Sequence, residues 1–174
     1  MTHAPTPSQT VGPFFAFGLC VRSQHELVDA DVPEAVCIAG RVLDGEGEPV
    51  PDAMVEIWQA DAQGSYGPGF GWARSGTNER GGYGFVTIKP GGVPGADGAI
   101  QAPHLNVLVF SRGLLKPVHT RLYFPDEAEA NAEDPVLSAV PEALRSSLVA
   151  VEEEGSLRFD VRLQGDDQTT FFAV

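Results

Sequence analysis

The fold of this chain is decided by a short alternating stretch, Met54-Val55-Glu56-Ile57-Trp58-Gln59. Successive side chains of an extended chain point to opposite faces, so Val55, Ile57 and Gln59 share one face of a predicted strand. Residues 44–49, Asp-Gly-Glu-Gly-Glu-Pro, precede this stretch and have the composition of a turn. A short strand bounded by such a turn is typical of an all-β domain.

The rest of the chain repeats this pattern of short apolar runs between turns, with 20 glycines and 14 prolines. Further strands are predicted at residues 36–43, 83–88, 104–111, 118–124, 148–152, 157–163 and 169–173. Short helices are predicted only at residues 126–132 and 141–145. Eight short strands with irregular connections favour an all-β fold, a β-sandwich of mixed-topology sheets with long loops and few short helices.

At 174 residues the chain is predicted to form one domain, residues 1–174, with residues 1–18 as an extended N-terminal arm. Two glycine-rich segments, residues 61–82 and 90–102, are predicted to be long loops, which are usually functional or mobile. The arm contains three phenylalanines, Phe14, Phe15 and Phe17. They are predicted either to pack on this domain or to cover a neighbouring chain, because exposing them to water is costly.

The formal charge of −13 argues against nucleic acid or an anionic membrane as a partner, because both require a basic surface. An anionic substrate would therefore have to be met by a locally placed cation. Cys20 and Cys37 are too few for a disulfide framework and lack the spacing of metal ligands. Without a signal sequence or a membrane span, the chain is predicted to be cytoplasmic, with two reduced thiols.

Several segments resemble the signature sequences of the intradiol ring-cleaving dioxygenases. They are residues 7–15 (PSQTVGPFF), 40–42 (GRV), 49–51 (PVP), 55–62 (VEIWQADA), 64–66 (GSY), 83–91 (YGFVTIKPG), 120–124 (TRLYF) and 159–165 (FDVRLQG). The likeness extends through nearly the whole chain, and several segments are long enough to be specific. Residues 102–106 (APHLN) and 110–113 (FSRG) resemble the α chains of heteromeric members, whereas the iron-binding β chains carry a His-x-His pair there.

The resemblance implies a hetero-oligomer of αβ units in which a homologous β chain alone holds a nonhaem Fe(III). The implied reaction uses O2 to cleave protocatechuate (3,4-dihydroxybenzoate) to 3-carboxy-cis,cis-muconate. Tyr66 and His104 match two iron-ligand positions of the family, whereas Val93 and Asn106 stand where its second tyrosine and second histidine would be. Valine has no donor atom and an asparagine carbonyl is a poor substitute for imidazole, so no metal site is expected on this chain.

Arg112 is the main candidate for substrate binding. It follows the apolar run at residues 107–110, and a lone arginine at a strand end usually forms a surface salt bridge. The resemblance places it instead in the substrate pocket, where a guanidinium suits the ring carboxylate of protocatechuate. The resemblance also implies that Thr10, Gly12 and Pro13, at the tip of the arm, help to wall that pocket. The alternative is that the arm only straps the two chains together.

Other residues have simpler interpretations. Tyr83 is predicted to be a core tyrosine, Arg121 and Tyr123 to hold the sheet and the subunit interface, and Glu56 to need a hydrogen-bonding or cationic partner if buried. A non-enzymatic transthyretin-like binding or scaffold domain is the alternative function, and a self-sufficient dioxygenase with an unusual metal set is a third. The arm and Arg112 favour the α-subunit hypothesis, because a scaffold needs neither.

Overall fold

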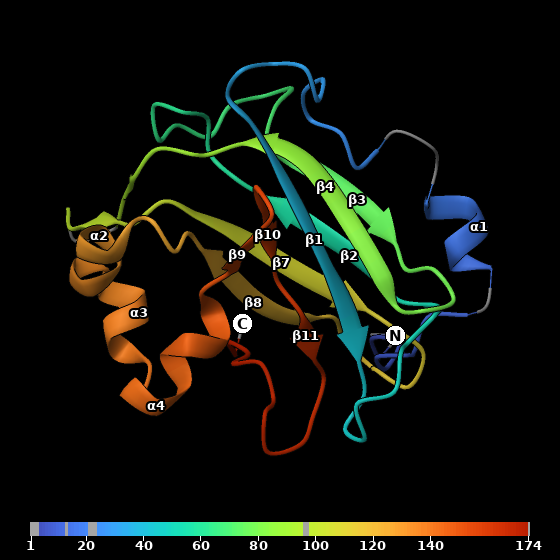
Figure 1. Cartoon of the computed structure of the whole chain (residues 1–174). Helices are drawn as coiled ribbons and strands as arrows, with labels where there is room; N and C mark the ends of the chain where they lie inside the picture. The colour runs from blue at the N-terminus through green and yellow to red at the C-terminus, as the bar shows by residue number, and fades with distance from the viewer. Residues whose placement is uncertain (1–3, 13, 21–23, 96–97, 174) are drawn as a thin grey trace.

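The computed structural model describes residues 4–12, 14–20, 24–95 and 98–173, except for the side chains of Ala16 and Phe17. Two sheets pack face to face, which confirms the predicted all-β sandwich (Figure 1). The first sheet has the order β11-β1-β10-β9, with β4 beside β1. Its strands are β1 (Ala35–Leu43), β4 (Gly82–Ile88), β9 (Val151–Glu153), β10 (Ser156–Arg158) and β11 (Val161–Arg162). β1 pairs in parallel with β10 and β11 and antiparallel with β4, so this sheet is mixed, as predicted.

The second sheet has the order β3-β2-β7-β8 and is antiparallel throughout. Its strands are β2 (Met54–Trp58), β3 (Trp72–Gly76), β7 (His104–Phe110) and β8 (Val118–Tyr123). A small hairpin of β5 (Val93–Pro94) and β6 (Ile100–Gln101) lies within the predicted loop at residues 90–102. β2 confirms the strand predicted at residues 54–59, with Val55 and Ile57 buried and Trp58 41% exposed.

The core between the sheets is built from one face of each strand. Val55 and Val107 from the second sheet join Ile38, Val42 and Phe85 from the first in one buried cluster. Each such side chain contributes roughly 1.5–3 kcal/mol by leaving water. The strands predicted at residues 36–43, 83–88, 104–111 and 118–124 are confirmed as β1, β4, β7 and β8.

Short helices cover one end of the sandwich, where they bury a second, smaller cluster that includes Leu137 and Leu148. These helices are α2 (Ala128–Glu133), α3 (Pro135–Ala139), α4 (Glu142–Arg145) and the 3-10 helix η1 (Ser146–Leu148), whereas α1 (Phe15–Leu19) lies on the opposite side of the molecule (Figure 1). α2 and α4 lie at the predicted helical segments, whereas the sequence pattern does not predict α1 or α3. α3 begins where it does because the Asp134 carboxylate accepts hydrogen bonds from the first free N–H groups of the helix.

β3 lies within residues 61–82, which the sequence predicts to be a loop, and that prediction is wrong for this part. Trp72 and Ala73 are its only apolar side chains and they are adjacent, so no alternating pattern marks it. Its pairing with β2 places Arg74 opposite Glu56, and Arg74 Nε donates to Glu56 Oε1 at 2.8 Å. Both side chains are largely buried, so this ion pair supplies the partner that Glu56 is predicted to need.

The single strand predicted at residues 157–163 is wrong, because Phe159 interrupts it and divides it into β10 and β11. The Phe159 N–H donates to the Ala39 carbonyl at 2.9 Å, while its own carbonyl accepts a hydrogen bond from the Tyr83 hydroxyl at 2.5 Å. Tyr83 is buried in the core, as predicted. Gly40 allows the backbone of Phe159 to lie this close to β1, because a Cβ atom at residue 40 would lie 1.9 Å from the Phe159 carbonyl oxygen.

Two further strand predictions near the C-terminus are corrected. The strand expected at residues 148–152 begins only at Val151, because Leu148 closes η1. Residues 169–173 form no strand but an isolated bridge between Phe172 and His119. Side-chain hydrogen bonds, and not the backbone pairing of a strand, hold this segment. Thr120 Oγ1 donates to the Thr170 carbonyl at 2.8 Å.

Replacing Gly40 by alanine is expected to lower the free energy of unfolding by about 3 kcal/mol or more. The added methyl group would overlap backbone atoms of Phe159, which cannot move without breaking the pairing of β1 with β10 and β11. Urea unfolding followed by circular dichroism would measure the change. Gly67→Ala is the matched control, because no atom lies within 4 Å of a Cβ there. Equal stability of the two variants would contradict the prediction.

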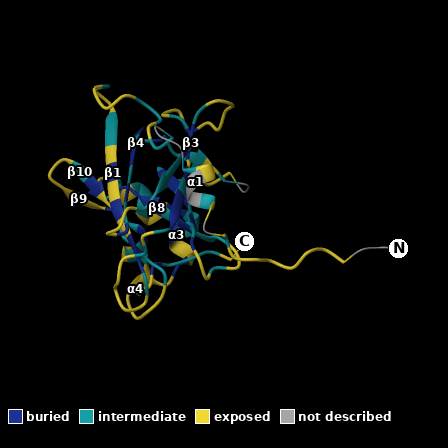
Figure 2. Ribbon diagram, turned by 90° about the vertical axis from the view of Figure 1, so that its right-hand side faces the viewer, coloured by how far each residue is buried: buried dark blue, intermediate teal, exposed yellow. Residues whose placement is uncertain are grey.

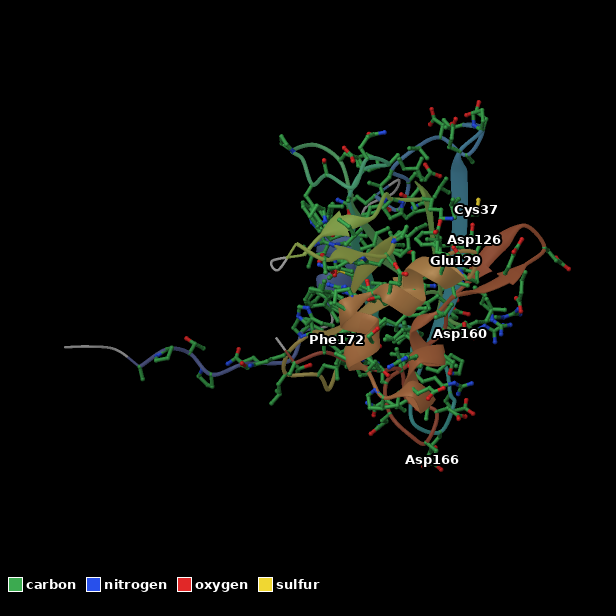
Figure 3. The ribbon with its side chains drawn as sticks, turned by 90° about the vertical axis from the view of Figure 1, so that its left-hand side faces the viewer. Cys37, Asp126, Glu129, Asp160, Asp166 and Phe172 are labelled. Carbon is green, nitrogen blue, oxygen red and sulfur yellow. The ribbon has the colours of Figure 1, made fainter. Side chains whose placement is uncertain are left out.

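The N-terminal arm leaves the sandwich at the end opposite α2 and α3. Residues 4–10 are exposed and lead away from the body of the molecule (Figure 2). Residues 4–20 include no charged side chain. Asp126, Glu129 and Asp160 lie on the side away from the arm (Figure 3).

Cys20 and Cys37 are both free thiols, Cys20 half-buried and Cys37 exposed. Within residues 4–12, 14–20, 24–95 and 98–173, no helix has the length and apolar character needed to cross a membrane.

Candidate functional site

One face of the second sheet points away from the core and carries polar and aromatic side chains. A row of cross-strand neighbours spans its four strands, with Trp72 on β3, Trp58 on β2, Asn106 on β7 and Arg121 on β8. His104 lies two residues along β7 from Asn106, so its side chain is on the same face. The residues at the four iron-ligand positions of the family, Tyr66, Val93, His104 and Asn106, are called the degenerate ligand positions. Two of them, His104 and Asn106, therefore lie beside Arg121 on one surface.

Tyr66 reaches this row from the loop that follows β2. Its ring stacks on Trp58, with centroids 6.1 Å apart and planes 5° apart. Asn106 Nδ2 donates hydrogen bonds to the Tyr66 hydroxyl at 3.1 Å and to the Trp58 carbonyl at 3.3 Å. Burial raises the pKa of Tyr66, while the bond from Asn106 and the charge of Arg121 act in the opposite direction. The phenol is therefore protonated at neutral pH.

His104 is almost completely buried, with 2% of its surface exposed. Its Nδ1–H donates to the Ala102 carbonyl at 2.7 Å, which leaves the lone pair of the neutral ring on Nε2. Burial lowers the pKa of His104 to about 4, and the nearby charge of Arg121 acts in the same direction. The imidazole is therefore neutral and fixed in one orientation.

A hydrogen-bond network connects Arg121 to the end of the sheet near α3. Arg121 Nη1 donates to Gln101 Oε1 at 2.8 Å and to the Tyr123 hydroxyl at 3.3 Å. The Tyr123 hydroxyl donates to Asp134 Oδ1 at 3.1 Å. Asp134 is fully buried and also accepts a bond from the Ala102 N–H at 2.8 Å. The carboxylate therefore joins Arg121, the cap of α3 and the backbone beside His104.

A second group of predicted residues meets at the turn after β7. Arg112 lies in this turn with a 64% exposed side chain and forms an ion pair through Nε with Asp52. The N–H of Gly113 donates to Thr10 Oγ1 at 2.9 Å, which ties the tip of the arm to the same turn. Gly12 accepts a hydrogen bond from the Phe15 N–H at 3.2 Å, and Pro13 lies outside the described residues.

The two groups lie at opposite ends of β7. His104 and Asn106 are at its start and Arg112 follows its end, so about 20 Å of extended chain separates Asn106 from Arg112. Arg112 and Thr10 therefore cannot act on a ligand bound at the degenerate positions of the same chain.

The family model described as Dioxygenase matches residues 12–165. The chain belongs to the intradiol dioxygenase family. It is 44% identical to the protocatechuate 3,4-dioxygenase alpha chain of Burkholderia cepacia, with 99% of each chain covered. These matches confirm the resemblance inferred from the sequence segments.

One further relative and one solved structure extend the comparison. It is 35% identical to the protocatechuate 3,4-dioxygenase beta chain of Burkholderia cepacia over 78% of this chain and 67% of that one. The dioxygenase domain of a carbohydrate-binding fusion protein from Streptomyces sp. SirexAA-E has the same fold, with a TM-score of 0.61 and 24% identity, covering 93% of this chain and 99% of that one. The sequence relatives thus include separate alpha and beta chains, and the fold is shared with the dioxygenase domain of a fusion protein.

The four degenerate positions do not fit the ferric ion used in this family. Val93 has no donor atom, and the amide nitrogen of Asn106 faces Tyr66. Tyr66 and His104 retain ligand atoms of the required types, so only two of the four donors remain. Across the described part of the chain, no group of three or more His, Cys, Asp and Glu side chains could hold a metal ion.

The sequence does not select Asp52 or Asp134 as residues of these groups, and it gives Arg121 a different role. Asp52 and Asp134 belong to no motif, and their partners, which include Arg112 and the Ala102 N–H, lie in other elements of the fold. Arg121 is predicted to hold the sheet and the subunit interface, but the structure places it among the degenerate ligand positions. One sequence feature could have indicated this position for Arg121. Arg121 and Tyr123 alternate along one strand and so share a face, and the pairing of β8 with β7 makes it the face that carries His104 and Asn106.

The buried His104 is expected to make stability depend on pH. The unfolded histidine takes a proton near its ordinary pKa of 6.5, whereas the folded one does so only near pH 4. Its contribution is therefore complete above pH 6.5 and is lost as the pH falls towards 4, by about 3 kcal/mol in free energy of unfolding.

Urea unfolding at pH 7 and pH 4 would measure this loss, which is expected to be about 3 kcal/mol smaller in His104→Asn than in the parent chain. An amide side chain can still donate to the Ala102 carbonyl but does not titrate. His25→Asn, at an exposed histidine, is the matched control. An identical pH dependence in the parent and His104→Asn would contradict the prediction.

Proposed function

We propose that this chain is the α subunit of a protocatechuate 3,4-dioxygenase and acts in the cytoplasm with a homologous β chain. The β chain holds the Fe(III), and the assembly uses O2 to cleave protocatechuate to 3-carboxy-cis,cis-muconate. The 44% identity to an alpha chain over its whole length supports this proposal, as does the existence of a related beta chain. The same matches support an enzyme subunit over the alternative of a scaffold domain.

The observation that carries the proposal is that the degenerate ligand positions and the group formed by Arg112 and Thr10 lie at opposite ends of β7. Thr10 and Arg112 are held together at one end, far from the degenerate ligand positions at the other. An exposed guanidinium beside an uncharged arm can meet the carboxylate of an aromatic acid, although the chain as a whole is strongly acidic. This arrangement is useful in an active site to which two chains contribute.

Within such a site the residues of this chain bind and enclose the substrate. Arg112 binds the ring carboxylate and so fixes the orientation of the two hydroxyl groups. Thr10, Gly12 and Pro13 form part of the pocket wall, and the bond between Thr10 and Gly113 keeps that wall next to Arg112. The ferric ion of the partner chain supplies the activation of the catechol towards O2.

Expression of this chain alone and together with a β chain tests the proposal. The lone chain should be colourless, free of iron and inactive, whereas the purified complex should contain iron and show protocatechuate-dependent O2 uptake. A lone chain that cleaves the ring would support a self-sufficient dioxygenase. A chain that never forms a complex with β and never affects its turnover would support the scaffold alternative.

A further inference from the structure

Asp52 is the only carboxylate that forms an ion pair with Arg112 among the residues that the structure describes. Asp52 lies two residues before β2, and Arg112 lies two residues after β7. Met54 and Phe110 are ladder partners on these strands, so the same antiparallel register, continued beyond the strands, places Asp52 opposite Arg112. The pairing of β2 with β7 therefore brings the carboxylate to the guanidinium.

The backbone around Asp52 is held by Thr77, which follows β3. The Ala53 N–H donates to Thr77 Oγ1 at 2.9 Å, and the Thr77 N–H donates to the Ala53 carbonyl at 2.9 Å. Thr77 Oγ1 in turn donates to the Val50 carbonyl at 2.8 Å. Ala53 belongs to the buried cluster between the sheets. The Asp52 carboxylate therefore extends from a fixed segment, and its position does not depend on Arg112.

Arg112 lies in a more exposed setting. Its side chain is 64% exposed, whereas that of Asp52 is 28% exposed. A solvated arginine side chain samples many rotamers and loses that freedom when it binds a ligand. The contact with Asp52 is made through Nε, the guanidinium nitrogen closest to the backbone. A carboxylate at Nε leaves the terminal end of the planar fork, formed by the two Nη atoms, available to a second carboxylate.

We propose that Asp52 is a positioning residue for the substrate, because it holds the Arg112 guanidinium by Nε and so directs the two Nη groups at the ring carboxylate. This inference rests on the proposed function, in which Arg112 binds that carboxylate. Asp52 also lowers the positive charge that the substrate meets, but water and salt screen this effect at a partly exposed pair. Holding the arginine in its binding rotamer avoids an ordering cost on binding, and this effect is the larger of the two.

Steady-state O2 uptake by the αβ complex tests the role of Asp52. Asp52→Ala is expected to raise the KM for protocatechuate about 3- to 10-fold, with much less change in kcat. The KM for catechol, which lacks the ring carboxylate, should stay the same. Asp52→Asn keeps an acceptor oxygen for the Nε–H and should recover most of the affinity. In an Arg112→Ala background, Asp52→Ala should have no further effect, because Asp52 acts through the arginine.

Glu153→Ala is the matched control, because it removes the acidic partner of another exposed ion pair, with Arg158, and should leave both KM values unchanged. Circular dichroism checks the fold of every variant. Asp52→Ser, which also lacks the carboxylate, replaces Asp52→Ala if the alanine variant does not fold.

An NMR measurement on the full chain without the β chain separates this inference from the proposed function. The Arg112 Nε–H signal is identified by its absence in Arg112→Lys. Its exchange with water is expected to be slow in the parent chain and in Glu153→Ala, and to lose this protection in Asp52→Ala. A parent complex that is inactive on protocatechuate would refute the proposed function, and the exchange measurement would still decide whether Asp52 holds Arg112.

Three results would overturn the inference. The first is an unchanged or lower KM for protocatechuate in Asp52→Ala, because Asp52 would then be neutral or would compete with the substrate for Arg112. The second is an equal rise in the KM for catechol, which would show a general structural role. The third is unchanged water exchange at the Arg112 Nε–H in Asp52→Ala, which would show that the ion pair does not hold the guanidinium in solution.

Discussion

Replacing Arg112 by alanine in the αβ complex is expected to raise the KM for protocatechuate about 10- to 100-fold and to change kcat much less. The guanidinium meets the ring carboxylate in the bound substrate and in the transition state alike, so its loss weakens both by a similar amount. The side chain is held on one side by Asp52 through Nε and is otherwise exposed, which leaves it available to a carboxylate from another molecule. Steady-state O2 uptake over a range of protocatechuate concentrations measures the effect.

Two controls separate substrate binding from a general loss of charge. Arg80→Ala removes the same charge from an exposed turn between β3 and β4 and should leave KM unchanged. Catechol lacks the ring carboxylate, so its own KM should be similar in the Arg112→Ala and parent complexes. Arg112→Lys should recover part of the affinity, because lysine keeps the charge but not the planar pair of donors. An unchanged KM for protocatechuate would remove Arg112 from the pocket.

Deleting residues 1–13 is expected to lower kcat/KM for protocatechuate by about 100-fold or more. The described part of the arm is exposed at residues 4–10, and none of it belongs to either buried core cluster, so the shortened chain should still fold. A hydrogen bond from the Gly113 N–H to Thr10 Oγ1 ties the arm to the sandwich next to Arg112. Removal of the arm therefore acts at the proposed pocket and not on the core.

Size-exclusion chromatography of the deleted complex separates the two roles proposed for the arm. Loss of the αβ assembly would show that the arm straps the chains together. An intact assembly with poor turnover would show that it walls the pocket. Thr10→Val, which lacks the acceptor for the Gly113 N–H, should reproduce part of the turnover defect, and Thr10→Ser should not. Normal assembly and turnover after the deletion would contradict both roles.

The sequence predicts the fold wherever apolar side chains alternate. Residues 54–59 alternate clearly and form β2 in the predicted register. β3 has no such pattern, and its position depends on the ion pair that Arg74 forms with Glu56 on the neighbouring strand. The C-terminal run at residues 157–163 has the pattern of one strand but is interrupted at Phe159. The Phe159 carbonyl accepts a hydrogen bond from the Tyr83 hydroxyl in place of a bond to a neighbouring strand. These failures share a cause, since a contact distant in sequence outweighs the local preference.

The candidate site shows the same division. The chemical types of Val93 and Asn106 are enough to indicate that two ligand positions are lost, because a side chain without a suitable donor atom has none in any fold. Sequence also selects Arg112 and Thr10 as separate candidates, but it contains no information that a hydrogen bond to Gly113 brings them together. The ion pair of Arg112 with Asp52 is equally invisible in a linear chain.

The sequence by itself determined the fold class, the family and the loss of donor atoms at two ligand positions, because these depend on side-chain chemistry and local periodicity. Only the tertiary structure decided that Arg121 occupies the degenerate site and that Arg112 lies at the far end of β7 from it. Both facts depend on strand register, which sets the side chains that meet across a sheet. Register is fixed by the packing of the whole sandwich, since a slip of one residue would turn every side chain of a strand to the other face.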